Sequence, residues 1–299
     1  MNPKNILDSI FEYKKAYKNW IYIIIMLQLN KKDQLIKVKI RGGDILDIPV
    51  EMVIFVKKLI IYNNFRKGYR FDPIHGIVTF PYQGRSLKIK FYESGIFNGE
   101  FTSFLGDYDF LKKIKGHTVI DIGANIADST IWFAVNGASK VIAVEPYRWS
   151  YKMANENIKL NNLKSYIILL NAAYGPDKEI EINDTVTDIG TVLEEFKGGI
   201  KIPMLTLKSI LMQYYSKDVD GDLLLKMDCE GCEYNIVNEE ECILSKFNKI
   251  LIEYHNGCES LLEKLKRCGF SVEYTRPYIW YDKKTKRKLI QGYLYASKE

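Results

Sequence analysis

The stretch VIDIGANIADST, residues 119–130, decides the fold of this chain. Four residues from Val119 are typical of a buried β-strand. Gly123, Asn125 and Ala127 then form a turn of small residues that leads directly into a helix. A strand that passes through such a turn into a helix is typical of a site for a nucleotide-like ligand. The stretch therefore predicts the first β–α unit of a ligand-binding α/β sheet.

Strands and helices alternate from this unit to the end of the chain. The expected strands are 118–123, 140–146, 165–173, 222–228, 249–255, 270–276 and 289–297. The expected helices are 126–137, 147–162, 205–215, 231–240 and 258–269. Because several strands are apolar throughout, we expect a Rossmann-like, mostly parallel sheet covered on both faces. The last two strands have no helix between them, which indicates an antiparallel pair at one edge. We assign residues 111–299 to this domain.

The first 110 residues have a different rhythm. Residues 1–30 are expected to be helical and 35–40 and 44–50 to be strands, followed by a helix near 50–61 and strands at 77–80 and 86–92. This pattern predicts an N-terminal α+β extension over residues 1–110 with a small antiparallel sheet, and a role in substrate choice or partner binding.

The turn after the first strand restricts the ligand. A dinucleotide fingerprint needs three glycines, and this turn has only Gly123. Asp121 would repel a pyrophosphate but suits a cationic ligand. Glu145 ends the next strand, 22 residues after Gly123 (145 − 123), where a carboxylate can accept hydrogen bonds from both ribose hydroxyls. Asn171 and Ala172 end the third strand and leave room for a flat base. These residues favour S-adenosylmethionine.

With these residues in hand, the chain resembles the FkbM-type methyltransferases, a branch of the class I S-adenosylmethionine-dependent family. The likeness covers about residues 115–297 and is carried by VIDIGANIADST, VIAVEPY (141–147), LLNAAYG (169–175), LLKMDCEGCEYNIV (224–237) and ILIEYH (250–255). It implies a seven-stranded sheet with an antiparallel last strand, and O-methylation, typically of a sugar hydroxyl on a glycan, glycolipid or natural product.

The resemblance also implies which residues bind the cofactor. On that likeness Asp121, Gly123, Asn125 and Glu145 fall on cofactor positions, and with their neighbours and the end of the third strand we expect the cofactor to contact Ala124, Pro146, Asn171 and Ala172 as well. The family often has glycine where this chain has Ala127. Alanine is still small, so we expect it to be tolerated and to make the loop stiffer.

Methyl transfer to a hydroxyl needs an aligned oxygen and help with its proton. Two expected strand ends carry the candidates. Asp228 and Glu230 follow one strand, and Glu253 and His255 end another. We predict that Asp228 lies beside the transfer site, that His255 is the base and that Glu253 orients one of them. Glu230 could instead begin a helix, where its charge is favoured.

The residues of this region allow two further interpretations. Asp228, Glu230 and His255 could bind Mg²⁺, but we expect no metal ion. Cys229 and Cys232 form a C-x-x-C pair, which can indicate zinc or redox chemistry. Since no second pair lies at zinc spacing, we expect a buried structural role.

The bulk composition restricts location and partners. No window has the roughly 20 apolar residues of a membrane span; Trp20 to Leu29 is about half that length and indicates a buried element or a membrane-touching helix. Five cysteines, an odd number, favour a reducing cytoplasm over a disulfide framework.

The positive charge of the chain is unevenly distributed. Residues 1–110 hold 17 Lys/Arg against 11 Asp/Glu, and the remaining residues hold 26 of each, so the net charge of +6 lies in the first part. This favours an anionic partner such as an acidic glycan or a lipid headgroup.

The sequence therefore predicts an S-adenosylmethionine-dependent O-methyltransferase with a small-molecule or glycan acceptor. The absence of a [DNS]-P-P-[FYW] motif argues against a nucleobase amine, and we expect no nucleic-acid partner. A nicotinamide-dependent oxidoreductase and a non-catalytic module of glycan assembly are the alternatives. The sequence does not determine the oligomeric state.

Overall fold

The computed structural model describes most of the chain. The described residues are 3–29, 34–42, 45–61, 68–72, 74–93, 96–97, 102–104, 108, 111, 114–176, 178–183, 198–216, 221–281 and 288–298. The chain divides into two compact units, Met1–Glu100 and Phe101–Glu299. We had placed the functional division at residue 110, which stays a prediction.

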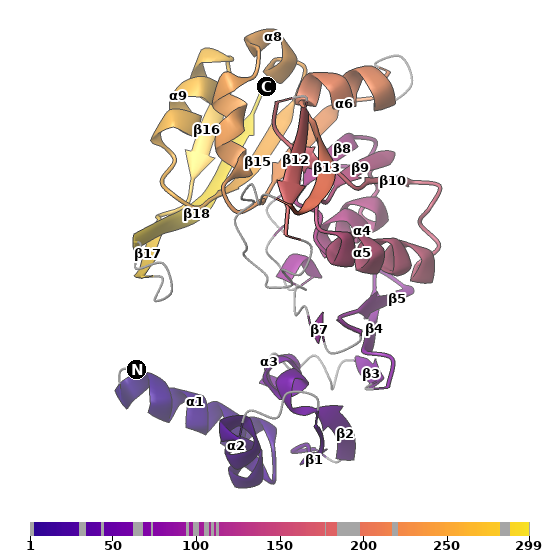
Figure 1. Ribbon diagram of the computed structural model, residues 1–299, viewed down its shortest axis with the longest axis vertical. Helices are drawn as coiled ribbons and strands as arrows, with labels where there is room; N and C mark the ends of the chain where they lie inside the picture. The colour runs from indigo at the N-terminus through magenta and orange to yellow at the C-terminus, as the bar shows by residue number, and fades with distance from the viewer. Residues whose placement is uncertain are drawn as a thin grey trace. The chain divides into compact units, whose positions relative to one another are not determined.

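The second unit contains the large sheet that the sequence predicted (Figure 1). Among the described residues its strands are β8 (Thr118–Ile122), β9 (Lys140–Val144), β10 (Ile167–Leu170), β14 (Leu223–Met227), β15 (Lys249–Tyr254), β16 (Ser271–Tyr274), β17 (Tyr278–Tyr281) and β18 (Lys288–Ser297). Their order is β10-β9-β8-β14-β15-β18-β16, and β17 also pairs with β18. All pairs from β10 to β15 are parallel, and β18 is antiparallel to both of its neighbours in this order. The predicted antiparallel last strand is confirmed.

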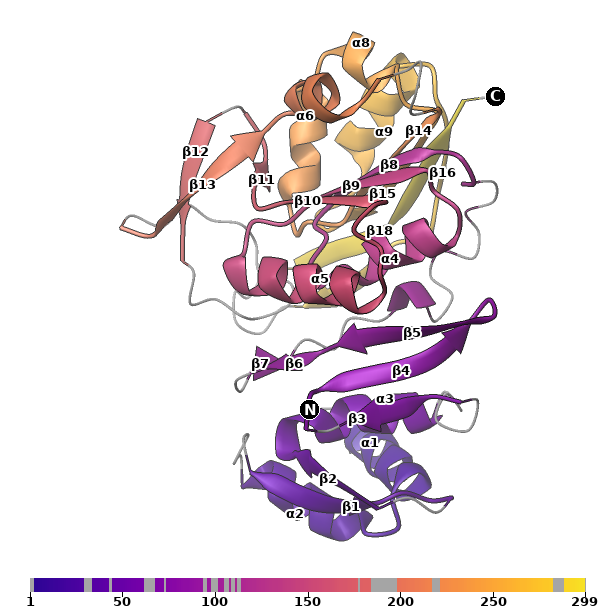
Figure 2. The ribbon, with the colours of Figure 1, turned by 90° about the vertical axis from the view of Figure 1, so that its right-hand side faces the viewer.

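Helices cover both faces of this sheet, as Figure 2 shows. α4 (Asp128–Val135) and α5 (Arg148–Leu160) lie on one face. α6 (Leu207–Tyr214), α8 (Glu241–Leu244) and α9 (Glu259–Arg267) lie on the other. Buried side chains of α6 and α9 join those of β8, β14 and β15 in one hydrophobic core. The doubly covered parallel sheet is therefore confirmed.

Local sequence explains where several of these elements begin and end. α6 begins after Thr206, whose hydroxyl accepts a hydrogen bond from the Ser209 amide at 3.1 Å and so caps the helix. The helix predicted over 231–240 is instead a 3₁₀ helix, η4 (Cys232–Asn238), which follows Gly231 in a left-handed conformation.

A second, smaller sheet in this unit was not predicted. β11 (Ala173–Tyr174), β12 (Lys178–Ile182) and β13 (Ile200–Leu205) form it in the order β11-β13-β12. The strand predicted over 165–173 is consequently divided between β10 of the large sheet and the start of β11. The single turn η3 (Thr102–Phe104) precedes the large sheet.

The first unit is an α+β structure, described here by itself. Its helices are α1 (Pro3–Ala16), α2 (Trp20–Gln28), η1 (Val50–Met52) and α3 (Val53–Ile61). Its strands are β1 (Leu35–Lys39), β2 (Ile45–Pro49), β3 (Arg70–Asp72), β4 (Ile77–Tyr82), β5 (Arg85–Lys90), β6 (Tyr92–Glu93) and β7 (Ile96–Phe97). They form the antiparallel sheets β1-β2, β3-β4-β5 and β6-β7.

The apolar stretch near residue 20 forms the nine-residue helix α2, which buries Ile23 and Met26. Among the described residues, no helix has both the length and the apolar character that crossing a membrane requires.

Candidate functional site

Gly123 lies where the end of β8 meets the end of β14. Its φ is +80°, and an added Cβ would lie 1.9 Å from the carbonyl oxygen of Asp228. The amides of Gly123 and Ala124 donate to the carbonyl of Val144 at 3.0 and 3.1 Å. Glycine is therefore required here because three strand ends come together, and this contact joins the predicted cofactor turn to the predicted catalytic cluster.

The rest of the turn has an unusual backbone. Asn125 and Ala127 have φ values of +48° and +69°, and Ala127 immediately precedes α4. A left-handed conformation costs a residue with a Cβ about 1–2 kcal/mol. This explains why glycine suits position 127, and it shows that the fold accommodates alanine there with strain.

Asp121 has a different environment from the one we predicted. Its side chain is fully buried, and one carboxylate oxygen accepts hydrogen bonds from Ser129 and Thr130 of α4 at 2.7 and 2.6 Å. The other oxygen lies 3.0 Å from Nζ of Lys226, its directly paired residue on β14. Lys226 therefore pairs with the charge of Asp121 inside the protein, and the role of Asp121 toward a cationic ligand stays a prediction.

Lys226 is the main residue that the sequence reasoning missed. It is 2% exposed, and its ammonium also donates to the carbonyl of Gly123 at 3.0 Å. Burial alone would lower the pKa of Lys226, but the charges of Asp121 and Asp228 raise it above its ordinary value. The available signal was a single lysine in the apolar strand LLLKM.

Glu145 directly follows β9, and its side chain contacts the turn after β8. It is 4% exposed, and its two oxygens accept hydrogen bonds from the amides of Asn125 and Tyr147, both at 2.9 Å. Burial raises the pKa of Glu145 to about 7, although these two amides oppose the shift. An ionised carboxylate has about four lone-pair positions, so two remain for hydroxyl donors of a ligand.

The side chain of Asn171 links the end of β10 to the loop after β9. Its side-chain amide donates to the carbonyls of Glu145 and Pro146, both at 2.9 Å, and Ala172 beside it is buried. The Asn171 side chain therefore holds the loop after β9 in place, and only the backbone and the small size of Ala172 are left for the predicted base site.

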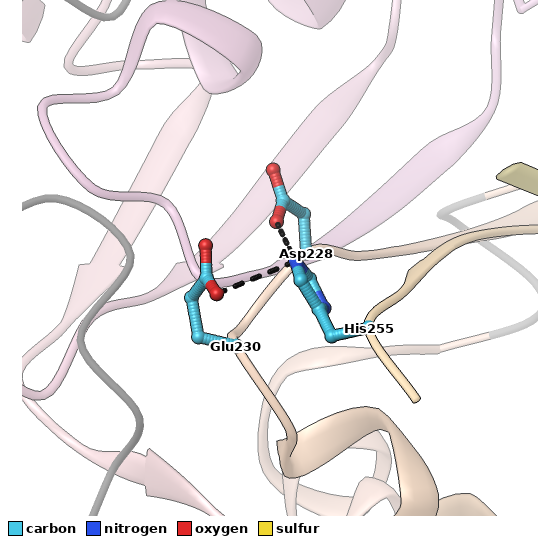
Figure 3. Close-up of side chains that lie close together, drawn as sticks. All are labelled: Asp228, Glu230 and His255. Atoms are coloured by element: carbon cyan, nitrogen blue, oxygen red, sulfur yellow. Dashed lines mark ion pairs between the residues drawn. The ribbon is translucent and has the colours of Figure 1, made fainter. Parts of the chain in front are cut away.

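The ends of β14 and β15 bring together three predicted catalytic residues. Figure 3 shows the carboxylates of Asp228 and Glu230 pointing toward the imidazole of His255. Nε2 of His255 lies 3.4 Å from Oε2 of Glu230 and 4.0 Å from Oδ1 of Asp228. The His255 side chain is 8% exposed, whereas those of Asp228 and Glu230 are 36% and 32% exposed. The cluster is thus anchored by a buried imidazole and open on its acidic side.

The carboxylate that contacts the ring of His255 is Glu233, whereas the sequence predicted that Glu253 orients either His255 or Asp228. Nδ1 of His255 lies 2.9 Å from Oε1 of fully buried Glu233, whose other oxygen accepts from the amide of Gly231 at 2.7 Å. Glu253 instead accepts a hydrogen bond from Gln291 on β18 at 2.9 Å. The topology of the chain explains these contacts. Glu233 lies on η4, which passes next to the ring of His255, whereas Glu253 lies on β15, which pairs with β18.

Burial and neighbouring charges both shift the pKa values of these groups. Burial would lower the pKa of His255, but its bond to Glu233 and the charge of Glu230 raise it to about 9. Burial, and then the charge of Asp228, raise the pKa of Glu253 to about 7. Contacts with neighbouring acids therefore favour the protonated form of the His255 imidazole, and its role as the base stays a prediction.

Tyr108 was also missed. It is buried, and its ring lies 5.4 Å from that of Trp132 and 5.6 Å from that of Phe133 on α4. Burial, followed by the charge of Asp228, raises the pKa of its phenol well above the ordinary value. Its sequence position in the extension gave no sign that it belongs near this site.

Cys229 and Cys232 form a disulfide that spans Glu230 and Gly231. We expected a buried structural role for this pair; the two residues are half-buried and joined to each other. The other three cysteines, Cys242, Cys258 and Cys268, are free.

The chain shares general features with several solved structures. An uncharacterized protein from Listeria monocytogenes serotype 4b is 15% identical, with a TM-score of 0.36 over 62% of this chain and 64% of that one. Precorrin-6y C5,15-methyltransferase from Geobacter metallireducens is 14% identical, with a TM-score of 0.37 over 64% and 85%. P. horikoshii TYW2, in complex with MeSAdo, is 16% identical, with a TM-score of 0.39 over 93% and 99%. The first match spans less than two thirds of the Listeria protein.

None of these likenesses is close enough to indicate a substrate. Among curated proteins, none matches the sequence of this chain. The methyltransferase FkbM domain, in contrast, matches residues 121–272, from the end of β8 to the start of β16. Because this match spans 152 of the 299 residues (272 − 121 + 1), the chain belongs to the FkbM methyltransferase domain family.

Proposed function

We propose that the protein is an S-adenosylmethionine-dependent O-methyltransferase that methylates a sugar hydroxyl of a glycan, glycolipid or natural product. The contact of Gly123 with the backbone of Asp228 is the observation that carries this proposal. This contact supports the proposal because the turn after β8 lies next to Asp228, which belongs to the cluster with Glu230 and His255. A cofactor in the turn and an acceptor at the cluster would therefore meet.

The residues present fit the cofactor. Glu145 retains lone pairs for the two ribose hydroxyls, and the turn from Gly123 to Asn125 lies beside it. The end of β10, at Asn171 and Ala172, borders the same corner. S-Adenosylmethionine, when bound, supplies a methyl group carried on a sulfonium.

The cluster at the ends of β14 and β15 has the acceptor role in this proposal. Asp228, Glu230 and His255 hold the acceptor oxygen in line with the methyl group, which is the main demand of a displacement reaction. A carbon–oxygen bond forms and the carbon–sulfur bond breaks. In this proposal an acid or the imidazole of the cluster takes the hydroxyl proton, and His255 is the base that the sequence predicted.

Two alternatives from the sequence are less well supported. A hydride-transferring enzyme would need a dinucleotide site, and membership of a methyltransferase family weighs against one. A non-catalytic module would have no need of the Glu145 and His255 environments. We keep the acceptor as a small molecule or glycan and expect no nucleic-acid partner.

A cytoplasmic location belongs to the proposal as well. The odd number of cysteines supports it, and the disulfide between Cys229 and Cys232 weighs against it, because disulfides are rare in reducing compartments.

Calorimetric titration of S-adenosylmethionine into the full chain tests the cofactor. We expect micromolar binding by the wild type, loss of binding in Glu145→Ala, and no change in Glu263→Gln, which alters an exposed acid on α9. A wild type that binds no cofactor, alone or with candidate acceptors, would remove the basis of the proposal. Mass analysis of sugars after incubation with the cofactor then identifies the methylated hydroxyl.

A further inference from the structure

His255 has a buried nitrogen without a hydrogen-bond partner. Nε2 of His255 makes no hydrogen bond in the described part of the chain, although the residue is only 6% exposed. The nitrogen points at the carboxylates of Asp228 and Glu230 (Figure 3). Leaving a buried polar atom unpaired costs about 1–3 kcal/mol, so the arrangement is explained best by a ligand that the nitrogen contacts.

The spacing of the three side chains suits a metal ion. One donor atom from each of Asp228, Glu230 and His255 lies within 4.8 Å of the other two. Donors bound to one ion at about 2.1 Å lie about 3.0–3.5 Å apart. The 3.4 Å between His255 and Glu230 already falls in this range, whereas the 4.0 Å to Asp228 and separations of up to 4.8 Å within the trio require the carboxylates to move closer when an ion binds.

The imidazole is held as metal-binding histidines are held. Such histidines usually donate their second ring N–H to a carboxylate, which fixes the tautomer and the ring orientation. Here Nδ1 of His255 is 2.9 Å from fully buried Glu233. With the proton on Nδ1, the lone pair on Nε2 faces the cluster.

The surrounding charges also favour a cation. Four acids face the site or its immediate neighbours: Asp228, Glu230, Glu233 and Glu253. The buried ammonium near them, Lys226, is already paired with Asp121 at 3.0 Å. An added divalent cation would offset this excess of negative charge.

We infer that Asp228, Glu230 and His255 bind one divalent cation, contrary to the expectation from the sequence. Two carboxylates with an imidazole suit Mn²⁺ or Zn²⁺ better than Mg²⁺, because Mg²⁺ strongly prefers oxygen ligands. The purpose of the ion rests on the proposed function: it would hold the acceptor hydroxyl and lower its pKa. His255 is then a ligand of this ion.

Direct metal binding tests the inference without any need for an acceptor. The full chain is treated with a chelator and titrated with Mn²⁺, and free Mn²⁺ is followed by electron paramagnetic resonance; Zn²⁺ is tested by competition. We expect one site per chain, with at least tenfold weaker binding in Glu230→Gln and His255→Gln. Glu233→Gln should weaken binding about 10–100-fold through the ring orientation.

Glu263→Gln serves as the matched control and should bind like the wild type. Thermal melts establish that each variant is folded. If His255→Gln does not fold, Glu230→Gln decides, because its side chain is partly exposed. Wild-type protein that leaves both metals free, or a folded Glu230→Gln that binds as tightly as the wild type, would overturn the site.

The same samples separate this inference from the proposed function. S-Adenosylmethionine binding is measured by calorimetry in parallel. Metal binding without cofactor binding leaves the metal site standing and removes the methyltransferase proposal. Cofactor binding without metal binding overturns the metal site and leaves the methyltransferase proposal standing.

Discussion

Single residues at the junction of β8, β9 and β14 determine whether the site can form. Gly123 shows this most directly, because a Cβ there would lie 1.9 Å from the Asp228 oxygen. Gly123→Ala should therefore cost about 2–5 kcal/mol, the sum of left-handed strain and overpacking. Urea denaturation measures the loss. Gly269→Ala is the control, since its φ of +82° is similar but an added Cβ meets nothing within 4 Å. Equal losses in the two variants would show that the contact with Asp228 does not matter.

The buried pair of Lys226 and Asp121 leads to a second prediction at the scale of single residues. Lys226→Met leaves Asp121 buried without its cation, so we expect a loss of about 3–5 kcal/mol in unfolding free energy. Adding Asp121→Asn should recover part of the loss, since the unpaired charge is then gone. Urea denaturation of the wild type, both single variants and the double variant gives the coupling energy. Strictly additive losses would contradict the pairing.

Glu145 predicts a pH dependence. Its pKa is raised from 4.5 to about 7, so its contribution to stability is present below pH 4.5 and is lost as the pH rises through 7. Cofactor affinity should change in the opposite direction, because ribose hydroxyls bind the ionised carboxylate. Affinity should be about tenfold weaker at pH 6 than at pH 8. Calorimetry at several pH values measures it, and a flat profile would exclude Glu145 as the ribose acceptor.

At the scale of elements, the sequence predicted what depends on local pattern. Buried apolar strands such as LLLKM and the helices between them were recognisable because hydrophobic periodicity is a local property. The β11-β13-β12 sheet was missed since KEIEI, residues 178–182, has only two apolar residues, Ile180 and Ile182, and so gives a short and weak alternating pattern.

The candidate site was predictable only in part for a related reason. The convergence of strand ends followed from a parallel sheet, and Asp228, Glu230 and His255 do meet. Which residue lies beside which was not predictable. The pairing of Asp121 with Lys226 depends on the register of β14 against β8, and the contact of Glu233 with His255 depends on the path of η4.

The disulfide at the start of η4 leads to a prediction about how many cysteines react with an alkylating reagent. Cys229 and Cys232 are joined, and three cysteines are free. Alkylation of the unfolded, unreduced protein should therefore label three of the five cysteines, and all five after reduction. Mass spectrometry counts the labels. Five labels before reduction would show a reduced pair and would support the cytoplasmic location.

At the scale of the whole molecule, the first part of the chain combines positive charge with exposed apolar side chains. Residues 1–110 carry the entire net charge of +6. On α2, Ile21, Tyr22 and Ile25 are 58%, 43% and 49% exposed. Apolar side chains together with basic residues are typical of surfaces that rest on anionic lipid.

We therefore predict that the full chain sediments with vesicles containing anionic lipid and not with neutral vesicles. Binding should weaken as salt rises, because basic residues near an anionic surface contribute about 1 kcal/mol each and salt screens them. Ile25→Glu should weaken binding further by placing a charge in the apolar face, whereas Met212→Glu, at an 80% exposed position of α6, should not. Equal sedimentation with neutral and anionic vesicles would contradict the electrostatic part, and an unchanged Ile25→Glu would contradict the role of α2. If both predictions hold, the first unit brings the methyltransferase unit to membrane-bound acceptors, which favours a glycolipid among the proposed substrates.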